Sequence, residues 1–562
     1  VGSLENRVDE NVEDMGRLVL DATNLGNFSN VRVINGEEDI PMEAGSSKVN
    51  DKTPKAFINV VEDMETMLYP ECKTYKRLEF IIALLHIKVS NKWSDSSFSM
   101  LLKVLHKAFN NDKKIPQNSY EAKKYTKALG LDYVKIDACI NHCVLFRNKY
   151  ANEDKCPKCL ASRWKEKVVQ GGDECSDNDS LKKRKRIPQL ILRHFPLIPR
   201  LQRMFISSKL AVHMRWHKDR HGTNDIDDDI MRHPSDSEAW KALDNQFPDF
   251  AADPRNIRLG LATDGFNPGG MSCRYSIWPV MLVPYNLPPW MCMKSDNIIL
   301  SLLIPGPKAP GNDIDVFLQP LIDELKELWD KGVQTFDAHS KDTFNMRASL
   351  LWTINDFPAY ANLSGWSTKG NLACPSCHKD TEFKRLAHGR KWCYMGHRRF
   401  LKVDHKWRLN RSCSFGKKVE RGPPPNSLSG HDVLEQLSGY SNVEFGKNTN
   451  RKRKKGERYI VHQWRKRSIF FELPYWKHLL LRHNLDVMHV EKDVCESLLG
   501  TLLDLPEKSK DSLIARLDLD GMSMHEPLQA KKLGYNNSEI THAPSTLELA
   551  ESVKSCIFLP TL

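Results

Sequence analysis

The sequence predicts an α/β protein with additional helical and cysteine-rich regions, and three observations lead to this class. Short β-like runs begin at Asn256, a long amphipathic segment follows them, and another apolar run comes next. That order of strands, helix and strand is typical of an α/β layer domain. Two earlier segments, "FIIALLHIKV" and "SFSMLLKVLHKAF", carry apolar residues at helical spacing. A cluster of cysteines separates them from the predicted core.

The composition favours a folded, basic protein. The chain has 562 residues, with 83 Lys and Arg against 71 Asp and Glu, so its formal net charge is +12. Hydrophobic residues make up 40% of it, which excludes global disorder. No apolar run reaches the ~18 residues that a membrane helix needs, so we expect no membrane partner. The basic runs suit a polyanionic partner, and we expect no small-molecule substrate.

Composition shifts divide the chain into regions. We expect residues 1–50, with ten acids against four Lys and Arg, to form a disordered arm. Because the sequence lacks an initiator Met and stops after Leu562, we expect a fragment with a truncated C-terminal segment. The remaining predicted regions are a helical unit (51–135), a Cys-rich zinc module (136–166), a linker and basic helical DNA-binding region (167–255), the α/β core (256–505, with an insertion at about 366–470) and the C-terminal segment (506–562).

Cysteine usage predicts an intracellular protein with zinc sites, and a disulfide framework is the alternative. Among 14 cysteines, two pairs have the spacing C-x-x-C. The first pair completes the pattern C-x3-C-x12-C-x2-C, which is close to known zinc modules. His142 could replace one of these cysteines, and the module could contact DNA or only stabilise a small fold. The predicted zinc ligands are Cys139, Cys143, Cys156 and Cys159.

Two aspartates stand where predicted strands end. Asp264 follows the run Ile257–Thr263, and Asp356 follows the apolar run Leu350–Ile354. An acid that emerges from a buried strand is well placed to hold a metal, because open α/β sheets bind ligands at strand ends. The alternative is that each aspartate only forms a turn that ends its strand.

A third acid, Glu491, lies in a predicted helix over residues 487–503. At about 100° per residue, Val487, Val494 and Leu498 fall within about 60° of Glu491, so the carboxylate is on the apolar face. A buried carboxylate needs a partner, either a salt bridge or a metal. Together with the two aspartates it could hold two Mg²⁺ (or Mn²⁺) ions for phosphodiester chemistry.

Basic runs predict contacts with DNA. "KKRKR" and "RKRKK" resemble nuclear-localisation or phosphate-binding patches, and solvated charge runs are the alternative. His213, His217 and His221 have i, i+4, i+8 spacing in an Arg- and Trp-rich segment, which favours a DNA-facing helix over a metal site. The predicted nucleic-acid-binding residues are Lys182, Lys183, Arg184, Lys185, Arg186, Arg215, Trp216, His217, Arg451, Lys452 and Arg453.

Several blocks of the sequence resemble the transposase of plant CACTA (En/Spm) DNA transposons, a tnp2-like family. The resemblance spans roughly residues 50–505. The blocks are "FPLIPRLQRMFISSKLAVHMRWHKDR", "RLGLATDGFNPGGMSCRYSIWPVMLVPYNLPPWMCMK", "LSLLIPGPKAPGNDIDVFLQPL", "WTINDFPAYANLSGWSTKGNLACPSCHKDT" and "LRHNLDVMHVEKDVCESLLGTLL".

The resemblance implies an RNase H-like catalytic core with an Asp-Asp-Glu triad. By motif, the triad maps to Asp264, Asp356 and Glu491, with Asp486 and Glu496 as alternatives for the third acid. Where the family motif leads us to expect Glu-Lys-Asn, this chain has Asp493. The implied protein is a nuclear enzyme that binds transposon ends and target DNA, hydrolyses phosphodiesters with Mg²⁺ or Mn²⁺, transfers strands and acts as a homo-oligomer. The alternatives are a catalytically inactive DNA-binding derivative and a zinc-based interaction module.

A further similarity, to the antigen-receptor recombinase, implies a zinc site inside the inserted region. A C-x-x-C pair after the second aspartate and a His pair before the final glutamate would supply the four ligands. His478 and His378 are alternative ligands. The implied set is Cys374, Cys377, His483 and His489.

Overall fold

The computed structural model describes thirteen stretches of the chain. Within them, the chain divides into two compact units, one up to Thr353 and one from Ile354 onwards, with short later segments at 445–446 and 472–474 assigned to the first. The predicted arm 1–50 and most of the predicted C-terminal segment lie outside the described residues. The described stretches are 66–69, 71–73, 75–109, 115–128, 132–165, 186–220, 230–267, 275–411, 418–438, 445–446, 463–523, 531–532 and 538–539.

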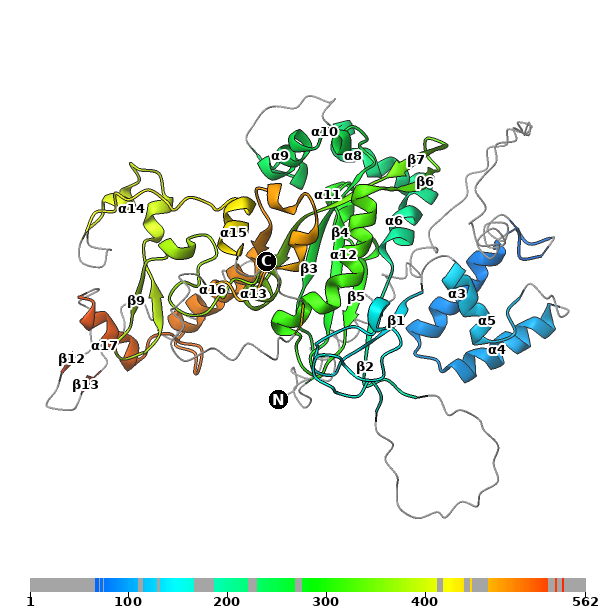
Figure 1. Ribbon diagram of the computed structural model, residues 1–562, viewed down its shortest axis with the longest axis horizontal. Coiled ribbons are helices and arrows are strands. Elements are labelled where there is room, and N and C mark those ends of the chain that lie inside the picture. The colour runs from blue at the N-terminus through cyan, green and yellow to red at the C-terminus, as the bar shows by residue number, and fades with distance from the viewer. Residues whose placement is uncertain are drawn as a thin grey trace, which may run out of the picture. The chain divides into compact units, whose positions relative to one another are not determined.

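Three helices near the start of the first unit pack into a small bundle (Figure 1). Their shared core consists of Ile81, Ile82, Leu85, Phe98, Leu102 and Ala122. The second helix begins after Ser94, whose side chain accepts a hydrogen bond from the Ser97 N–H and satisfies one of the open amides of the first turn. The helices are α3 (Arg77–Ser90), α4 (Asp95–Ala108) and α5 (Ser119–Ala128).

A seven-stranded mixed sheet, in the order β1-β2-β5-β4-β3-β8-β11, forms the centre of the fold and confirms the predicted α/β class. The pairs β1–β2, β2–β5, β5–β4 and β4–β3 are antiparallel. The Ile257 N–H donates to the Arg347 carbonyl, so β3 and β8 begin side by side and run in the same direction. The strands are β1 (Val134–Ala138), β2 (Leu190–His194), β3 (Ile257–Thr263), β4 (Trp278–Pro284), β5 (Ile299–Ile304), β8 (Ala348–Asn355) and β11 (His483–Leu485).

Helix α12 (Ile314–Asp330) lies along this sheet (Figure 1). Eleven of its residues are buried, including Phe317, Leu321 and Trp329, so this helix supplies a large share of the core. It follows β5, as the predicted order of strands, helix and strand requires. A separate hairpin, β6 (Val333–Asp337) with β7 (Asp342–Met346), comes before β8. The other helices of this unit are α6 (Leu197–Ile206), α7 (Ser208–Ala211), α8 (Trp216–Asp219), α9 (Glu238–Gln246), α10 (Pro248–Ala251) and α11 (Pro289–Cys292).

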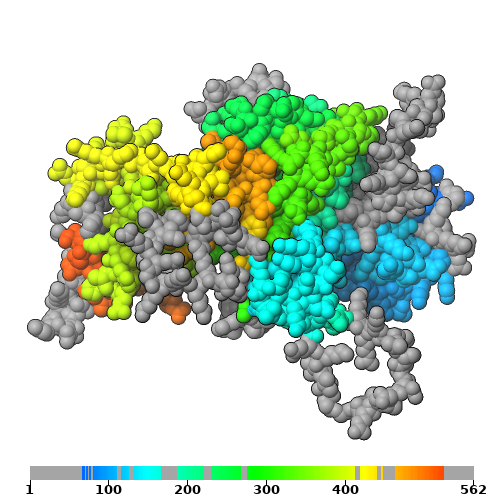
Figure 2. All heavy atoms as spheres, in the orientation of Figure 1, coloured from blue at the N-terminus to red at the C-terminus, as the bar shows by residue number. Residues whose placement is uncertain are grey.

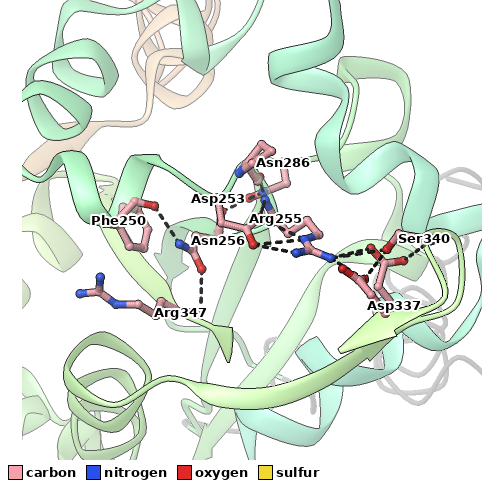
Figure 3. A network of polar contacts seen from close by, with 10 residues as sticks. Phe250, Asp253, Arg255, Asn256, Asn286, Asp337, Ser340 and Arg347 are labelled. Carbon is pink, nitrogen blue, oxygen red and sulfur yellow. Dashed lines mark hydrogen bonds and ion pairs between the residues drawn. The ribbon is translucent and has the colours of Figure 1, made fainter. Parts of the chain in front are cut away.

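A polar network fixes the beginnings of β3 and β8 (Figure 3). The Arg255 guanidinium contacts Asp253 at 2.8 Å and Asp342 at 2.8 Å, and lies 3.5 Å from the buried Asp337. The Asn256 side chain accepts from the Arg347 N–H at 2.9 Å. These contacts join the loop before β3 to the hairpin before β8 and so hold the first residues of both strands in position.

The second unit is built around aromatic side chains and short elements. Trp366 is 1% exposed and contacts Trp464, with ring centroids 4.9 Å apart. Tyr360, Val433 and Leu437 complete this cluster. Within the described residues no helix is both long and apolar enough to cross a membrane. The elements are α13 (Phe357–Ser364), β9 (Phe383–Arg385), β10 (Trp392–Tyr394), α14 (Lys406–Leu409), α15 (Gly430–Gln436), α16 (Val487–Leu502), α17 (Leu513–Gly521), β12 (Lys531–Lys532) and β13 (Ser538–Glu539).

Candidate functional site

Four cysteines converge in the module that follows β1, cyan in Figure 2. One ligand atom from each lies within 4.8 Å of the others, and all four thiols are free. The sulfurs of Cys139 and Cys159 are 3.4 Å apart, far longer than the ~2.05 Å of a disulfide. Four sulfurs at this separation suit a tetrahedral zinc ion. Cys139, Cys143, Cys156 and Cys159 therefore form a cluster that can bind zinc, which we call the four-cysteine centre.

Two tight turns build the four-cysteine centre. In the first, the Cys139 N–H donates to the Val144 carbonyl at 3.0 Å, and in the second the Cys156 N–H donates to the Ala161 carbonyl at 2.8 Å. His142, the alternative ligand, has its ring edge-on to Phe317 of α12 with centroids 5.2 Å apart. That ring therefore helps to pack the module against the core.

Burial and hydrogen bonds shift the pKa values of three of the four thiols. Burial raises the pKa of the Cys139 thiol to about 11 and raises that of Cys143 further. Burial would also raise the pKa of Cys159, but hydrogen bonds from the Asn141 side chain and the Ala161 backbone lower it to about 7. Without a cation, the centre thus holds protons that Zn²⁺ would displace, because zinc binds the thiolate form.

Asp264 and Asp356 each directly follow a strand. Asp264 is exposed at the end of β3, and its Oδ1 accepts from the Gly265 N–H at 2.5 Å. Asp356 ends β8 and caps α13, its Oδ1 accepting from the Ala359 N–H at 2.8 Å. The alternative role, in which the acid only ends its strand and starts the next element, is therefore real for Asp356. For Asp356 it uses one carboxylate oxygen and leaves Oδ2 for a cation.

The predicted helix around the third acid is present as α16, but the expected burial of Glu491 is wrong. Glu491 is exposed, and Val487, Val494 and Leu498 on the same face are 65%, 52% and 58% exposed. Among the described residues, nothing covers this apolar face. The periodicity located the helix correctly, but periodicity cannot say whether a partner surface lies against it. Glu496 is exposed as well.

Asp486, the other alternative for the third acid, adjoins the end of β8. Its N–H donates to the Asn355 carbonyl at 2.8 Å, directly beside Asp356. Its own Oδ1 caps α16 and accepts from the Met488 N–H at 3.0 Å. Asp356 and Asp486 thus occupy equivalent positions, each between a strand and the helix that follows it. Because β11 spans only three residues, it carries no strand signal in the sequence, and this pairing was not predicted.

The second C-x-x-C pair forms a similar turn, but the structure does not bring its four implied ligands together. The Cys377 N–H donates to Sγ of Cys374 at 3.3 Å. Among the described residues, the four-cysteine centre is the only group of three or more such side chains that converges on a metal position. His489 points along the exposed α16 to Asp493, 3.9 Å away.

The other histidines near this pair pack against aromatic rings. His483 contacts Tyr360, with centroids 5.7 Å apart, and Trp476, at 5.5 Å. Burial lowers the pKa of His483 to about 3 and that of His378 to about 4, so both rings are neutral at pH 7. His378 contacts Trp366 at 4.3 Å. His478 contacts another histidine, His431, at 5.2 Å.

The predicted DNA-facing helix is wrong for His217. The segment consists of three short pieces, α7, a 3-10 turn over Val212–Arg215, and α8, so i, i+4 spacing does not define one face. His217 is 6% exposed and contacts Trp240, with centroids 5.1 Å apart. Trp216 is half-buried, and Arg215 lies 3.7 Å from Asp219. The His217 ring therefore packs in the core, whereas the spacing of the histidines had indicated an exposed helix face.

The basic runs lie mostly outside the described residues. Arg186 is described, and it contacts Asp154 at 3.1 Å and lies over the Trp164 ring. His221 also lies outside. The predicted nucleic-acid-binding residues that lie outside are Lys182, Lys183, Arg184, Lys185, Arg451, Lys452 and Arg453.

Comparison with known proteins places the chain near transposases. Residues 228–439 match the family model described as transposase family tnp2. The matched stretch covers less than half of the chain and contains Asp264, Asp356 and the second C-x-x-C pair. No curated protein matches the chain. The match supports a transposase role, which implies DNA binding in general, and it does not extend to the four-cysteine centre or to α16.

Proposed function

We propose that this chain is a DDE-type transposase of the plant CACTA (En/Spm) class, acting on double-stranded DNA. The observation that carries the proposal is the tnp2 match, because the matched stretch contains two aspartates that each directly follow a strand. We also propose that the protein works in the nucleus as a homo-oligomer on paired transposon ends. The net charge of +12 supports a polyanionic substrate.

The strand order supports an RNase H-like core as part of this proposal. Three consecutive antiparallel strands, β3, β4 and β5, are neighbours in the sheet, and β8 and β11 follow on the other side of β3. The strands β2 and β1 extend the sheet beyond β5. Since β3 and β8 are neighbours and begin at the same edge, Asp264 and Asp356 follow the carboxyl ends of two parallel strands. Ligand sites of α/β sheets lie at such ends.

Carboxylate oxygens are the ligands that the divalent cations of the proposed chemistry prefer, but among the described residues Asp264, Asp356 and Glu491 do not converge on one metal position. Asp264, Asp356 and Glu491 would hold Mg²⁺ or Mn²⁺, which prefer carboxylate oxygens and supply Lewis-acid activation of water and of the leaving oxygen. The cap bond to Ala359 fixes the rotamer of Asp356 and so orients its second oxygen. Asp486 remains the competing third acid, because its backbone bonds to Asn355. Zn²⁺ at the four-cysteine centre would be structural.

A nicking assay tests the proposed activity. Wild type would cut DNA that carries the transposon's terminal inverted repeat in Mg²⁺ or Mn²⁺. Asp264→Asn and Asp356→Asn should each reduce cutting by at least ~100-fold while leaving DNA binding intact, because each removes one metal-binding charge. Asp249→Asn removes an exposed acid of α10, within the same matched stretch, and is the control for generic loss of charge.

The same nicking assay identifies the third metal-binding acid. Loss of cutting in Glu491→Gln, with cutting kept in Asp486→Asn, supports Glu491. The reverse result identifies Asp486. If wild type binds DNA and never cuts with either metal, the catalytic proposal is wrong and the alternative, an inactive transposase-derived DNA-binding protein, replaces it. The exposure of Glu491 is the observation that favours this alternative.

A further inference from the structure

An exposed aromatic face lies on the hairpin of β9 and β10, labelled at β9 in Figure 1. The register pairs Phe383 with Tyr394 and Arg385 with Trp392. Because paired residues, and residues two apart in a strand, project to the same side, these four side chains share one face. The three aromatic rings are 41%, 45% and 36% exposed in the order Phe383, Tyr394, Trp392. We call these four residues the aromatic platform.

Contacts within the platform hold its rings in place. Phe383 and Trp392 meet edge to face, with centroids 5.3 Å apart, and the Arg385 guanidinium lies 5.6 Å from the Trp392 centroid. The Tyr394 hydroxyl donates to the Gly370 carbonyl at 2.7 Å. Side chains that are already ordered lose little entropy when a ligand binds.

A helix from elsewhere in the same unit braces the turn of this hairpin. The N–H groups of His388 and Gly389 both donate to the Asp518 carboxylate of α17, each at 2.9 Å. Asp518 is buried, so these bonds are shielded from water. The turn and the two strands therefore present the platform as a rigid surface.

The surroundings of the platform are basic. Residues 380–411 contain ten Lys and Arg and three acids, Asp380, Glu382 and Asp404. Glu382 is paired with Arg399 at 3.0 Å. Arg399 and Arg408 point inward, and Arg408 donates to the carbonyls of Leu401 and Gly422 among others, so these two support the fold. Six other cations of this stretch are exposed, and they are Arg385, Arg390, Lys391, Lys402, Lys406 and Arg411.

We propose that the aromatic platform stacks unpaired bases of single-stranded DNA while the surrounding cations hold its phosphates. Exposed rings interleaved with cations are how proteins bind single strands without reading their sequence. An acidic peptide would match the charge but would leave the flat faces of the rings without a matching partner. Paired bases are stacked on each other and leave no face for the platform. The inference rests on the proposed function, because cuts at different positions in the two strands of a transposon end would leave unpaired nucleotides.

Binding of a labelled oligonucleotide to the full chain tests the platform. The probe is a mixed-sequence single strand of ~12 nucleotides, and a strand of equal length made of abasic units retains the phosphates without the bases. Fluorescence anisotropy in EDTA prevents cutting. Trp392→Leu should weaken binding of the normal strand by about 5-fold or more and leave the abasic strand unchanged, because only stacking is lost.

Two further variants control this test. Trp407→Leu removes a 47% exposed indole of the same region that lies off the hairpin, and its binding should stay within about 2-fold of wild type. Trp392→Phe keeps a ring and should restore most of the binding. Equal binding by wild type and Trp392→Leu, or equal losses for both strands, overturns the proposal. Asp356→Asn should bind the probe normally. Loss of DNA cutting and loss of single-strand binding can therefore be distinguished.

Discussion

The two C-x-x-C turns of this protein have the same spacing and different surroundings. Cys156 and Cys159 meet a second turn that supplies two more sulfurs, and all four lie within 4.8 Å. Cys374 and Cys377 instead adjoin His378, whose ring lies 4.3 Å from Trp366. The short motif predicts a local turn, whereas a metal site also requires ligands from a second segment. The turn at Cys156 is completed by two cysteine sulfurs from a second turn, and the turn at Cys374 is surrounded by aromatic rings.

The largest expected difference between the two turns is in zinc binding. Cys156→Ser should abolish the single zinc ion per chain that the four-cysteine centre can hold and should unfold the module, because structural zinc sites contribute about 10–16 kcal/mol to folding. Cys374→Ser is the matched control and should leave the zinc content unchanged. Metal analysis of purified chains measures both. Two zinc ions in wild type, with one lost in Cys374→Ser, would contradict the comparison.

The second turn should depend on aromatic packing. Trp366→Ala removes an indole that is 1% exposed and contacts both His378 and Trp464, so it should destabilise this unit by about 3–5 kcal/mol. Trp407→Ala, at an exposed position, should cost less than about 1 kcal/mol. Guanidinium unfolding followed by circular dichroism compares the variants. Similar midpoints for the two would show that the rings do not support the turn.

A smaller effect should separate two glycines with similar backbones. Gly446 has φ +94 and a Cβ there would lie 2.1 Å from the Cys143 carbonyl oxygen, whereas Gly370 has φ +95 and its nearest neighbour would be 3.8 Å away. Gly446→Ala should therefore lower the stability of the zinc module by about 2 kcal/mol more than Gly370→Ala lowers that of its own unit. The chelator concentration that removes zinc reports the first effect. Unchanged zinc retention in Gly446→Ala would show that a side chain at residue 446 does not clash with the four-cysteine centre.

The sequence predicted most of what depends on local pattern. The runs at 257–263 and 299–304, the helix 314–330 and the helix 487–502 appear as elements, and the spacing of the first four cysteines in the pattern correctly identified a convergent cluster. What it could not predict depends on contacts between distant segments. Periodicity placed Glu491 on an apolar face but could not reveal that the described residues leave this face uncovered.

The remaining misses have the same cause. His217 has ligand-like spacing, yet its ring packs on Trp240, which belongs to another helix. The backbone bond between Asp486 and Asn355 joins residues more than a hundred positions apart. The platform did carry a sequence signal, because Phe383 with Arg385, and Trp392 with Tyr394, alternate at the period of a strand. Three-residue strands are too short for that signal to stand out.

The proposed function requires that Asp264, Asp356 and a third acid hold a common divalent cation in the working protein. Replacing Mg²⁺ by Fe²⁺, with ascorbate and peroxide, generates radicals that cut the polypeptide next to the bound metal. We expect fragments that end near residue 264, near residue 356 and within 486–491, and all of them should be lost in Asp356→Asn. Cuts at only one of these places, or cuts that persist in Asp356→Asn, would show that the three acids do not hold a common metal and would contradict the account.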